Sequence, residues 1–216
     1  MSSLDAVNLE TYGTPTQEDS KGRKRPKPGE RRIQILQALA EMLENPQGER
    51  VTTAALAAKI QVSEAALYRH FASKAQMFDG LIAFIEQTIF GLINQIIAKE
   101  ENGRIQIQEI AMMLLAFSEK NPGMTRVLLG DSLFQEDARL QERINQVLER
   151  VEASMKQSFR IMQTQQNISW SADDISHRSG LVMSYVVGRW HRFARSGFTK
   201  SPLDNATASM GVLLFV

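Results

Sequence analysis

The stretch Val51-Thr-Thr-Ala-Ala-Leu-Ala-Ala-Lys-Ile-Gln-Val-Ser-Glu-Ala-Ala-Leu-Tyr-Arg-His-Phe71 decides the fold of the N-terminal part of this chain. Its apolar spacing predicts two short helices, over about 53–59 and 63–71, joined by a tight turn. Five apolar residues would interlock the pair and seat it on a preceding helix: Leu56, Ile60, Val62, Leu67 and Phe71. Two short helices packed in this way form a helix-turn-helix.

The outward face of the second of these helices suits DNA. Ala65 is small, so the helix can approach base edges closely, and the polar residues around it offer hydrogen-bond donors. The candidate DNA-binding residues are Arg31, Thr52, Thr53, Ser63, Glu64, Ala65, Tyr68, Arg69, His70 and Lys74. The alternative is an ordinary helical hairpin with an alanine-rich surface.

We expect these residues to divide into two groups. Phosphate contacts are expected from Thr52, Thr53, Tyr68, His70 and Lys74, together with a basic arm at 21–28. Base contacts are expected from the N-terminal part of the helix, namely Ser63, Glu64, Ala65 and Arg69. Thr52 and Ser63 also stand at the N-cap positions of their helices.

Charge is unevenly distributed along the chain. The 216 residues have a formal net charge of only +1. Residues 21–75, however, contain 11 basic and 5 acidic residues, whereas residues 1–20 contain four acidic residues and no Lys or Arg. A local basic excess is typical of a protein that binds a polyanion, although a solvated charge run would look the same.

The rest of the chain has helical periodicity throughout. We predict an all-α protein of about nine helices, with further helices at about 30–44, 104–119, 122–129, 135–165, 171–195 and 203–216, and a long helix that begins at Ser73 and carries apolar residues as far as Ile96. The expected organisation is a disordered tail with a basic arm over 1–29, a helix-turn-helix domain over 30–75, and a helical dimerisation and partner or ligand domain over 76–216.

Composition argues against several other classes of protein. There is no cysteine, which excludes disulfides and thiolate chemistry, and no run approaches the roughly 18 apolar residues of a membrane span. The acidic N-terminus is unlike a secretory signal, so we expect a cytoplasmic protein. We find no phosphate-binding loop or catalytic motif, and we expect neither an enzyme nor a cofactor. Asp173, Asp174 and His177 could be interpreted as metal ligands, but carboxylates at this position also suit a helix N-terminus without any ion.

Small residues recur every fourth position in the helix expected over 171–195. Ser176, Gly180, Ser184 and Gly188 would share one face, which permits close helix–helix approach. We expect a dimer interface here, with Gly180, Ser184, Val187 and Gly188 as its residues and Met183 and Trp190 flanking it. The alternative is a packing face within one chain. A dimer would place two recognition helices in successive major grooves of a palindromic site.

The motifs in residues 51–74 resemble the DNA-binding domain of the TetR family of bacterial regulators. The resemblance rests on Val51-Thr-Thr, Leu56-Ala, Val62-Ser-Glu-Ala-Ala-Leu-Tyr-Arg-His-Phe71 and Ser73-Lys74. It extends into the rest of the chain, because Leu81-Ile-Ala-Phe-Ile-Glu86, Asn121-Pro-Gly-Met-Thr-Arg126, Arg139-Leu-Gln-Glu-Arg-Ile-Asn-Gln146 and Arg192-Phe-Ala-Arg-Ser196 are similar to the nucleoid-occlusion branch of that family in gammaproteobacteria.

This resemblance implies a DNA-bound, nucleoid-associated dimer that contacts the tubulin-like cell-division GTPase and opposes division-ring assembly over the chromosome. The residues that match the family's partner surface are Phe84, Lys120 and Asn121. Two positions depart from the family pattern, because Leu92 and Lys120 stand where the family has arginine. Lysine cannot make the bidentate contacts of a guanidinium group.

Two other functions remain open at this point. The first is a transcriptional repressor released by a small ligand, in a pocket lined by Met112, Met113, Met124, Met155, Met162 and Met183. Methionine is also a common core filler, so the same residues fit a pocket-free core. The second is a protein-interaction module with vestigial DNA binding, which would show no duplex preference.

Overall fold

The computed structural model of the chain describes residues 29–45, 51–130 and 138–215. Within these ranges it contains nine helices and no strand, as the sequence predicts. The helices are α1 (Glu30–Leu43), α2 (Thr53–Lys59), α3 (Glu64–Tyr68), α4 (Lys74–Lys99), α5 (Gly103–Lys120), α6 (Pro122–Leu128), α7 (Ala138–Gln165), α8 (Ala172–Arg195) and α9 (Ala206–Leu213).

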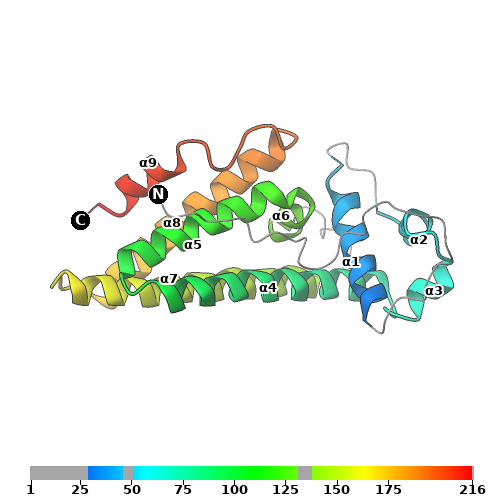
Figure 1. Ribbon diagram of the computed structural model, residues 1–216, viewed down its shortest axis with the longest axis horizontal. Helices are drawn as coiled ribbons and strands as arrows, with labels where there is room; N and C mark the ends of the chain where they lie inside the picture. The colour runs from blue at the N-terminus through cyan, green and yellow to red at the C-terminus, as the bar shows by residue number, and fades with distance from the viewer. Residues whose placement is uncertain (1–28, 46–50, 131–137, 216) are drawn as a thin grey trace.

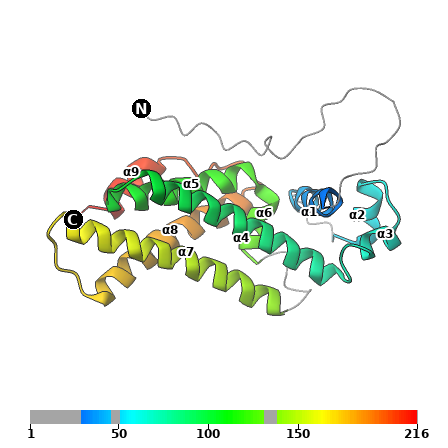
Figure 2. The ribbon, with the colours of Figure 1, turned by 60° about the horizontal axis from the view of Figure 1, so that its bottom comes forward.

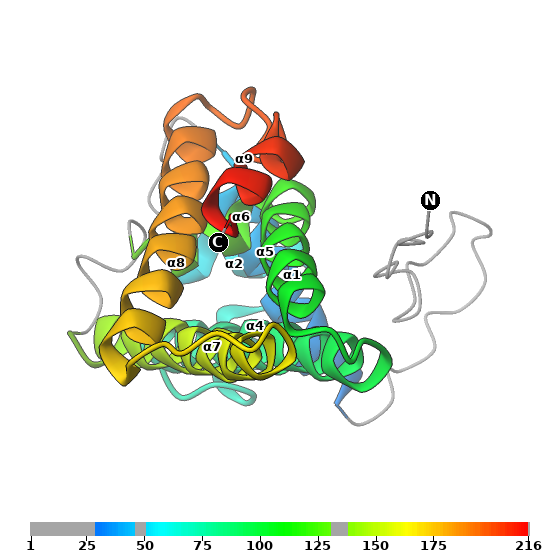
Figure 3. The same ribbon diagram turned by 90° about the vertical axis from the view of Figure 1, so that its left-hand side faces the viewer.

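The molecule is elongated, with α1, α2 and α3 at one end (Figure 1). We call α1–α3 the head and α4–α9 the body. Helix α4 starts beside the head and runs along the length of the body (Figure 2). Seen end-on, α4 and α7 form one side of the body, α5 and α8 rise from it, and α9 lies across the opposite side (Figure 3). One cluster of buried apolar side chains runs through head and body together.

The head forms where the sequence predicts it. Thr52 caps α2 by accepting a hydrogen bond from the Ala55 amide (3.1 Å), and Ser63 caps α3 in the same way (3.2 Å from Ala66 N). Between them, Gln61 adopts a left-handed backbone (φ 55°), which reverses the chain within three residues. Leu56, Leu67 and Phe71 are fully buried, and Ile60 and Val62 pack against them.

Several helix ends differ from the predicted ones. Helix α3 ends at Tyr68 rather than at residue 71, because the chain turns so that Phe71 can be buried under α1 and α4. Helix α9 covers only Ala206–Leu213 of the predicted 203–216. At the start of α4, Ser73 caps the helix by accepting from the Gln76 amide, and the Gln76 side chain accepts from the Ala72 amide.

Helix α4 is the one described helix that is long and apolar enough to cross a membrane by composition alone. Its apolar side packs against α1, α5, α6 and α7, which is the environment of a core helix. On the side toward α7, Glu86 accepts hydrogen bonds from Arg143 (3.2 Å) and from Arg150, and Arg143 also pairs with Asp79 (3.3 Å). Polar contacts thus fix α7 along α4.

Head and body meet where α6 crosses α1. A Cβ at Gly123 would lie 1.9 Å from the Ala40 carbonyl oxygen, so only glycine permits this approach. Beside it, the Arg126 guanidinium donates to the carbonyls of Leu43 (3.2 Å) and Asn45 (2.8 Å), which closes the C-terminal end of α1. The Asn-Pro-Gly motif therefore has two roles, because it ends α5 and its glycine allows α6 to pack directly against α1.

Candidate nucleic-acid interface

The outward face of α3 is open to solvent at the tip of the head. Glu64, Ala65, Tyr68, Arg69 and His70 are all exposed, and Tyr68 keeps 46% of its surface accessible despite its size. Leu67, on the inward face, is completely buried. The short helix is thus held from behind by one apolar residue, while five candidate DNA-binding side chains face outward together.

The two N-cap hydroxyls remain able to donate. Thr52 and Ser63 use an oxygen lone pair to accept from a backbone amide, so each hydroxyl proton is still available for another acceptor. Both residues are exposed on the same tip of the head as α3. This geometry suits the expected phosphate contact of Thr52 and leaves Ser63 free to donate to a phosphate or a base.

Thr53 differs from its expected role. Its hydroxyl donates to the Glu64 carboxylate across the turn, at 2.7 Å between Oγ1 and Oε2. A hydroxyl has one proton, so in this arrangement the proton serves Glu64 rather than a phosphate. The bond joins the first turn of α2 to the first turn of α3, a link between residues 11 positions apart that helical periodicity gives no reason to expect.

Two basic residues lie against aromatic rings beside α3. The Arg32 guanidinium stands 4.0 Å from the centre of the Phe71 ring and donates to the His70 carbonyl at 2.9 Å. The Lys74 ammonium lies 5.8 Å from the Phe78 ring centre, at the first residue of α4. Sequence reasoning missed Arg32, whose contacts hold the end of α3, and no local pattern marks it.

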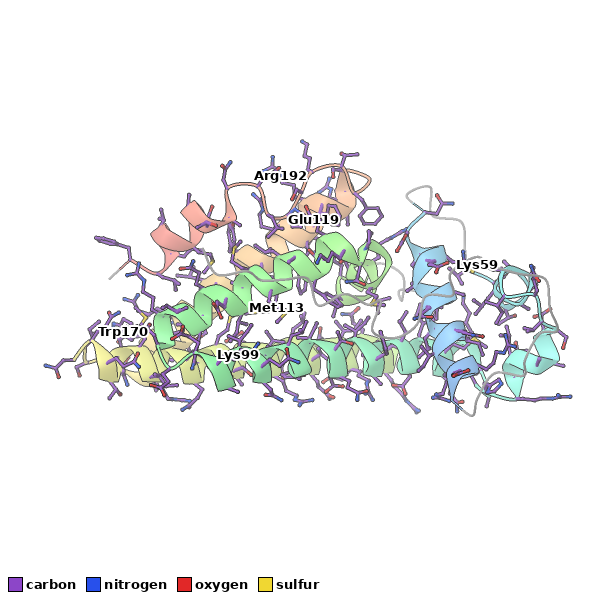
Figure 4. The ribbon with its side chains drawn as sticks, viewed as in Figure 1. Lys59, Lys99, Met113, Glu119, Trp170 and Arg192 are labelled. Atoms are coloured by element: carbon purple, nitrogen blue, oxygen red, sulfur yellow. The ribbon has the colours of Figure 1, made fainter. Side chains whose placement is uncertain are left out.

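The remaining basic candidates are less uniform. Arg31, in the first turn of α1, is half-buried rather than fully exposed. The basic arm at 21–28 lies outside the described residues. Lys59 of α2 (labelled in Figure 4) is not one of these candidates, and its ammonium pairs with the Glu41 carboxylate of α1 at 2.8 Å. Among the described candidates, the basic residues that are exposed at the tip of the head are therefore Arg69 and His70.

The small-residue face of α8 has no partner within the described residues. A Cβ built at Gly180 or Gly188 meets no atom within 4 Å, and Leu181 on the same side keeps 61% of its surface exposed. Ser184 is exposed and Val187 half-buried. The predicted flanking residues are placed otherwise, since Met183 and Trp190 are buried in the core, where Trp190 donates to the Leu114 carbonyl (3.2 Å).

Helix α9 continues this open face. Val212 and Phe215 are 78% and 80% exposed, and a Cβ at Gly211 would meet nothing within 4 Å. Arg189 holds the segment before α9 close to α8 by donating to three backbone carbonyls, at 2.7–3.0 Å, those of Ser201, Pro202 and Asp204. Helices α8 and α9 also contact each other, and we call their exposed small and apolar residues the α8–α9 face: Gly180, Leu181, Gly188, Gly211, Val212 and Phe215.

The three residues matched to the family's partner surface differ in accessibility. Lys120 is exposed at the end of α5, and Phe84 is half-buried on α4. Asn121 is 7% exposed, and its amide donates to the Phe117 carbonyl (2.8 Å) while its backbone oxygen accepts from Thr125. Asn121 is thus occupied in joining α5 to α6. Leu92 is half-buried and packs against the core.

The acidic start of α8 is a helix cap. Ser171 and Asp174 exchange hydrogen bonds as a capping box, with the Ser171 amide donating to the carboxylate at 2.9 Å and the Asp174 amide to the hydroxyl at 3.1 Å. Hydrogen bonds from Ser171 lower the pKa of Asp174. No group of three metal-ligating side chains occurs among the residues described.

The six methionines proposed for a ligand pocket take part in core packing. Met113, Met124, Met155, Met162 and Met183 are buried in the apolar cluster, and Met112 packs against it. Their flexible side chains fill the space between the helices of the body.

Comparison with known proteins identifies the family. The model described as "Bacterial regulatory proteins, tetR family" matches residues 35–81, and that described as "Tetracyclin repressor-like, C-terminal domain" matches residues 101–214. The chain is 49% identical over 174 residues to the nucleoid occlusion factor SlmA of Alteromonas mediterranea, covering 81% of this chain and 89% of the relative. It is 47% identical over 176 residues to SlmA of Vibrio cholerae, with the same shares covered.

Solved structures agree on the fold. The transcriptional regulator FadR from Bacillus subtilis, in complex with stearoyl-CoA, superposes with a TM-score of 0.69 at 13% identity, covering 84% of this chain and 97% of that one. The MbdR regulator from Azoarcus sp. gives 0.69 at 16% identity, covering 84% and 96%. With the family models and the relatives at 44–49% identity, the chain belongs to the TetR family of bacterial regulators, among the nucleoid occlusion factors, and is a DNA-binding regulator rather than an enzyme.

Proposed function

We propose that this protein is a homodimer that binds palindromic DNA sites across the chromosome and, while bound, blocks division-ring assembly by contacting the tubulin-like cell-division GTPase. The observation that carries the DNA-binding part is the open polar face of α3, with Leu67 buried behind it. The occlusion part is supported by the identity of 44–49% to nucleoid occlusion factors.

Dimerisation is supported by the α8–α9 face. Leu181, Val212 and Phe215 expose large apolar side chains on it. Gly180, Gly188 and Gly211 on the same helices leave room for another backbone to approach. Exposed apolar surface of this kind marks an interface. A two-fold dimer also meets the geometric need of a palindrome, because two α3 helices must reach major grooves about 34–36 Å apart, or a multiple of this.

The dimer is tested by placing a charge on this face. Leu181→Asp should convert the dimer to a monomer in analytical ultracentrifugation and weaken binding to a palindromic duplex. Ile97→Asp is the matched control, because Ile97 is also exposed (39%) but belongs to the last turn of α4, a helix outside the α8–α9 face. A dimer that survives Leu181→Asp would exclude the α8–α9 face.

We place the contact with the division GTPase on a surface that contains Phe84 of α4 and Lys120 at the end of α5. Asn121 would act by shaping this surface, since its side chain is already bonded to Phe117. Assembly of the purified GTPase, followed by sedimentation, should fall when the protein and a specific duplex are both present. Lys120→Glu should remove this effect while leaving DNA affinity unchanged.

A genome-wide map of binding sites in the native cell tests the whole proposal. Many palindromic sites spread over the chromosome but sparse near the replication terminus would support nucleoid occlusion. One or two sites beside the protein's own gene or a transporter gene would favour the second candidate, a repressor released by a small ligand. In that case a ligand should lower the DNA affinity of the purified protein.

A further inference from the structure

The Thr53–Glu64 hydrogen bond fixes a carboxylate in the middle of a surface that is otherwise suited to polyanions. Glu64 is exposed at the start of α3, where recognition helices meet the base edges. A carboxylate there repels the phosphates, so it lowers affinity for all DNA unless it gains something from a base. The hydrogen bond that it accepts within the head comes from a neutral hydroxyl, that of Thr53.

The donor geometry leaves the carboxylate with spare acceptor capacity. Thr53 donates to Oε2 alone, and an ionised carboxylate has about four lone-pair sites in all. Thr53 is half-buried at the first residue of α2, behind a fully buried Leu56, so the bond comes from a well-packed position. The bond therefore restricts the rotation of an exposed side chain that would otherwise sample several rotamers.

The chemistry of the major groove identifies the base that this carboxylate can read. Guanine presents only acceptors there, and thymine presents an acceptor and a methyl group, so neither base offers a hydrogen-bond donor to a carboxylate. Adenine has an amino donor, but its N7 acceptor lies beside it. Cytosine presents the N4 amino donor alone, and Glu accepting from cytosine N4 is an established pairing type.

We infer that Glu64 accepts a hydrogen bond from the N4 amino group of a cytosine in each half-site, and that Thr53 is the positioning residue that orients its carboxylate. This rests on the proposed DNA-binding function and adds the base that one side chain selects. The negative charge then contributes specificity twice, since it rewards cytosine and penalises binding to every other sequence.

The test starts with selection of bound duplexes from a randomised library by the full-length protein, followed by titration of the selected site and its single-base variants. For the wild type we expect one position per half-site at which replacing cytosine costs about tenfold in affinity. Glu64→Gln should remove this preference and raise affinity for unrelated duplexes. Because glutamine pairs with adenine through N6 and N7, it should also move the preference at that position toward adenine.

Variants of Thr53 test the positioning role. Thr53→Val keeps the shape of the side chain but removes the hydroxyl, so the preference for cytosine should fall about threefold, and Thr53→Ser should restore it. In the Glu64→Gln background, Thr53→Val should have no further effect, because its action passes through Glu64. Lys74→Ala is the control for a phosphate contact and should weaken all duplexes by the same factor.

The outcomes separate this inference from the proposed function. A wild type without any sequence preference would overturn both. A clear preference in the wild type that Glu64→Gln leaves unchanged at every position would overturn the reading of cytosine alone. Equal preference in Thr53→Val and wild type would assign the 2.7 Å bond no positioning role. Melting curves of each variant show whether the head remains folded.

Discussion

The head and the body of this protein are stabilised by different means. The head has helices of 14, 7 and 5 residues, and the two shortest depend on hydroxyl caps at Thr52 and Ser63. Four body helices have 18 to 28 residues and bury apolar side chains along their whole length. Short isolated helices are marginal in water, so the head needs its caps and the support of α4 and α6, whereas the long body helices supply most of the apolar cluster that both regions share.

This difference has a functional consequence. In the head, the hydroxyls that cap α2 and α3 each keep a proton that can be donated to another acceptor, so under the proposed function the same side chains would serve both local structure and DNA binding. In the body, buried residues such as Trp190 have no exposed surface and serve packing alone. Substitutions in the body should therefore change stability first, and substitutions in the head should change DNA binding first.

The largest effect is expected in the body. Trp190→Ala would empty a fully buried indole site and remove the indole N–H that donates to the Leu114 carbonyl, so we expect a loss of about 3–5 kcal/mol in the free energy of unfolding. Urea denaturation at a fixed protein concentration measures it. Trp190→Phe keeps most of the packing and should cost much less. A loss under about 1 kcal/mol for Trp190→Ala would contradict a tightly packed body core.

The next effect is expected at the junction of the two regions. Gly123→Ala would place a methyl group 1.9 Å from the Ala40 carbonyl oxygen, so α6 and α1 must separate. We expect a loss of about 1–3 kcal/mol, with lower DNA affinity and an intact dimer. Gly91→Ala is the control, because a Cβ there meets nothing within 4 Å and should stabilise α4 by about 0.5–1 kcal/mol.

Local sequence patterns predicted the helices and their caps, but not the contacts between residues that are far apart in the chain. Helices, caps and the buried face of the helix-turn-helix follow from local spacing, so the sequence predicts the N-caps Thr52 and Ser63 that the structure shows. The Asn-Pro-Gly motif follows the last residue of α5, yet the need for glycine at 123 comes from α1, about 80 positions earlier in the chain. Such contacts have no local signal.

The candidate site shows the same limit. The exposure of the outward face of α3 could be predicted, because apolar residues at helical spacing mark the opposite face of the helix as the buried one. The pairing of Thr53 with Glu64, and of Arg32 with the His70 carbonyl, depends on the angle between helices, which periodicity does not contain. The resemblance to the family pointed to Asn121 as a partner residue, whereas its burial became visible only in three dimensions.

A smaller effect is expected from the arginine that caps α1. Arg126→Met keeps the aliphatic part of the side chain but removes the donors to Leu43 and Asn45, so the cost should be about 1–2 kcal/mol. DNA affinity should fall a few-fold, because α1 supports α2 and α3. Arg126→Lys should restore only part of it, since an ammonium lacks the planar fork. Unchanged affinity in Arg126→Met would show that the head does not need this cap.

The smallest effects are pH-dependent and have opposite signs in head and body. At the end of α1, burial raises the pKa of Glu44, and the nearby Glu41 raises it further against a lowering by Lys59. The folded head therefore holds the Glu44 proton more tightly than the unfolded chain, and the stability gained on protonation is lost as pH rises through this raised pKa. Glu44→Gln should remove this slope and slightly stabilise the protein at pH 7.

At the start of α8 the sign is reversed. Hydrogen bonds from Ser171 lower the pKa of Asp174 below its ordinary value of about 3.9. The stabilisation by this carboxylate is present above that value and is lost as pH falls through the lower folded pKa. Asp174→Asn should therefore matter at pH 7 and cease to matter in strong acid. Melting curves between pH 3 and 7 for both variants would separate the two regions, because Glu44→Gln should raise the melting temperature at pH 7 while Asp174→Asn lowers it. Equal signs would mean that one of the two carboxyl groups lies in a different environment from the one described.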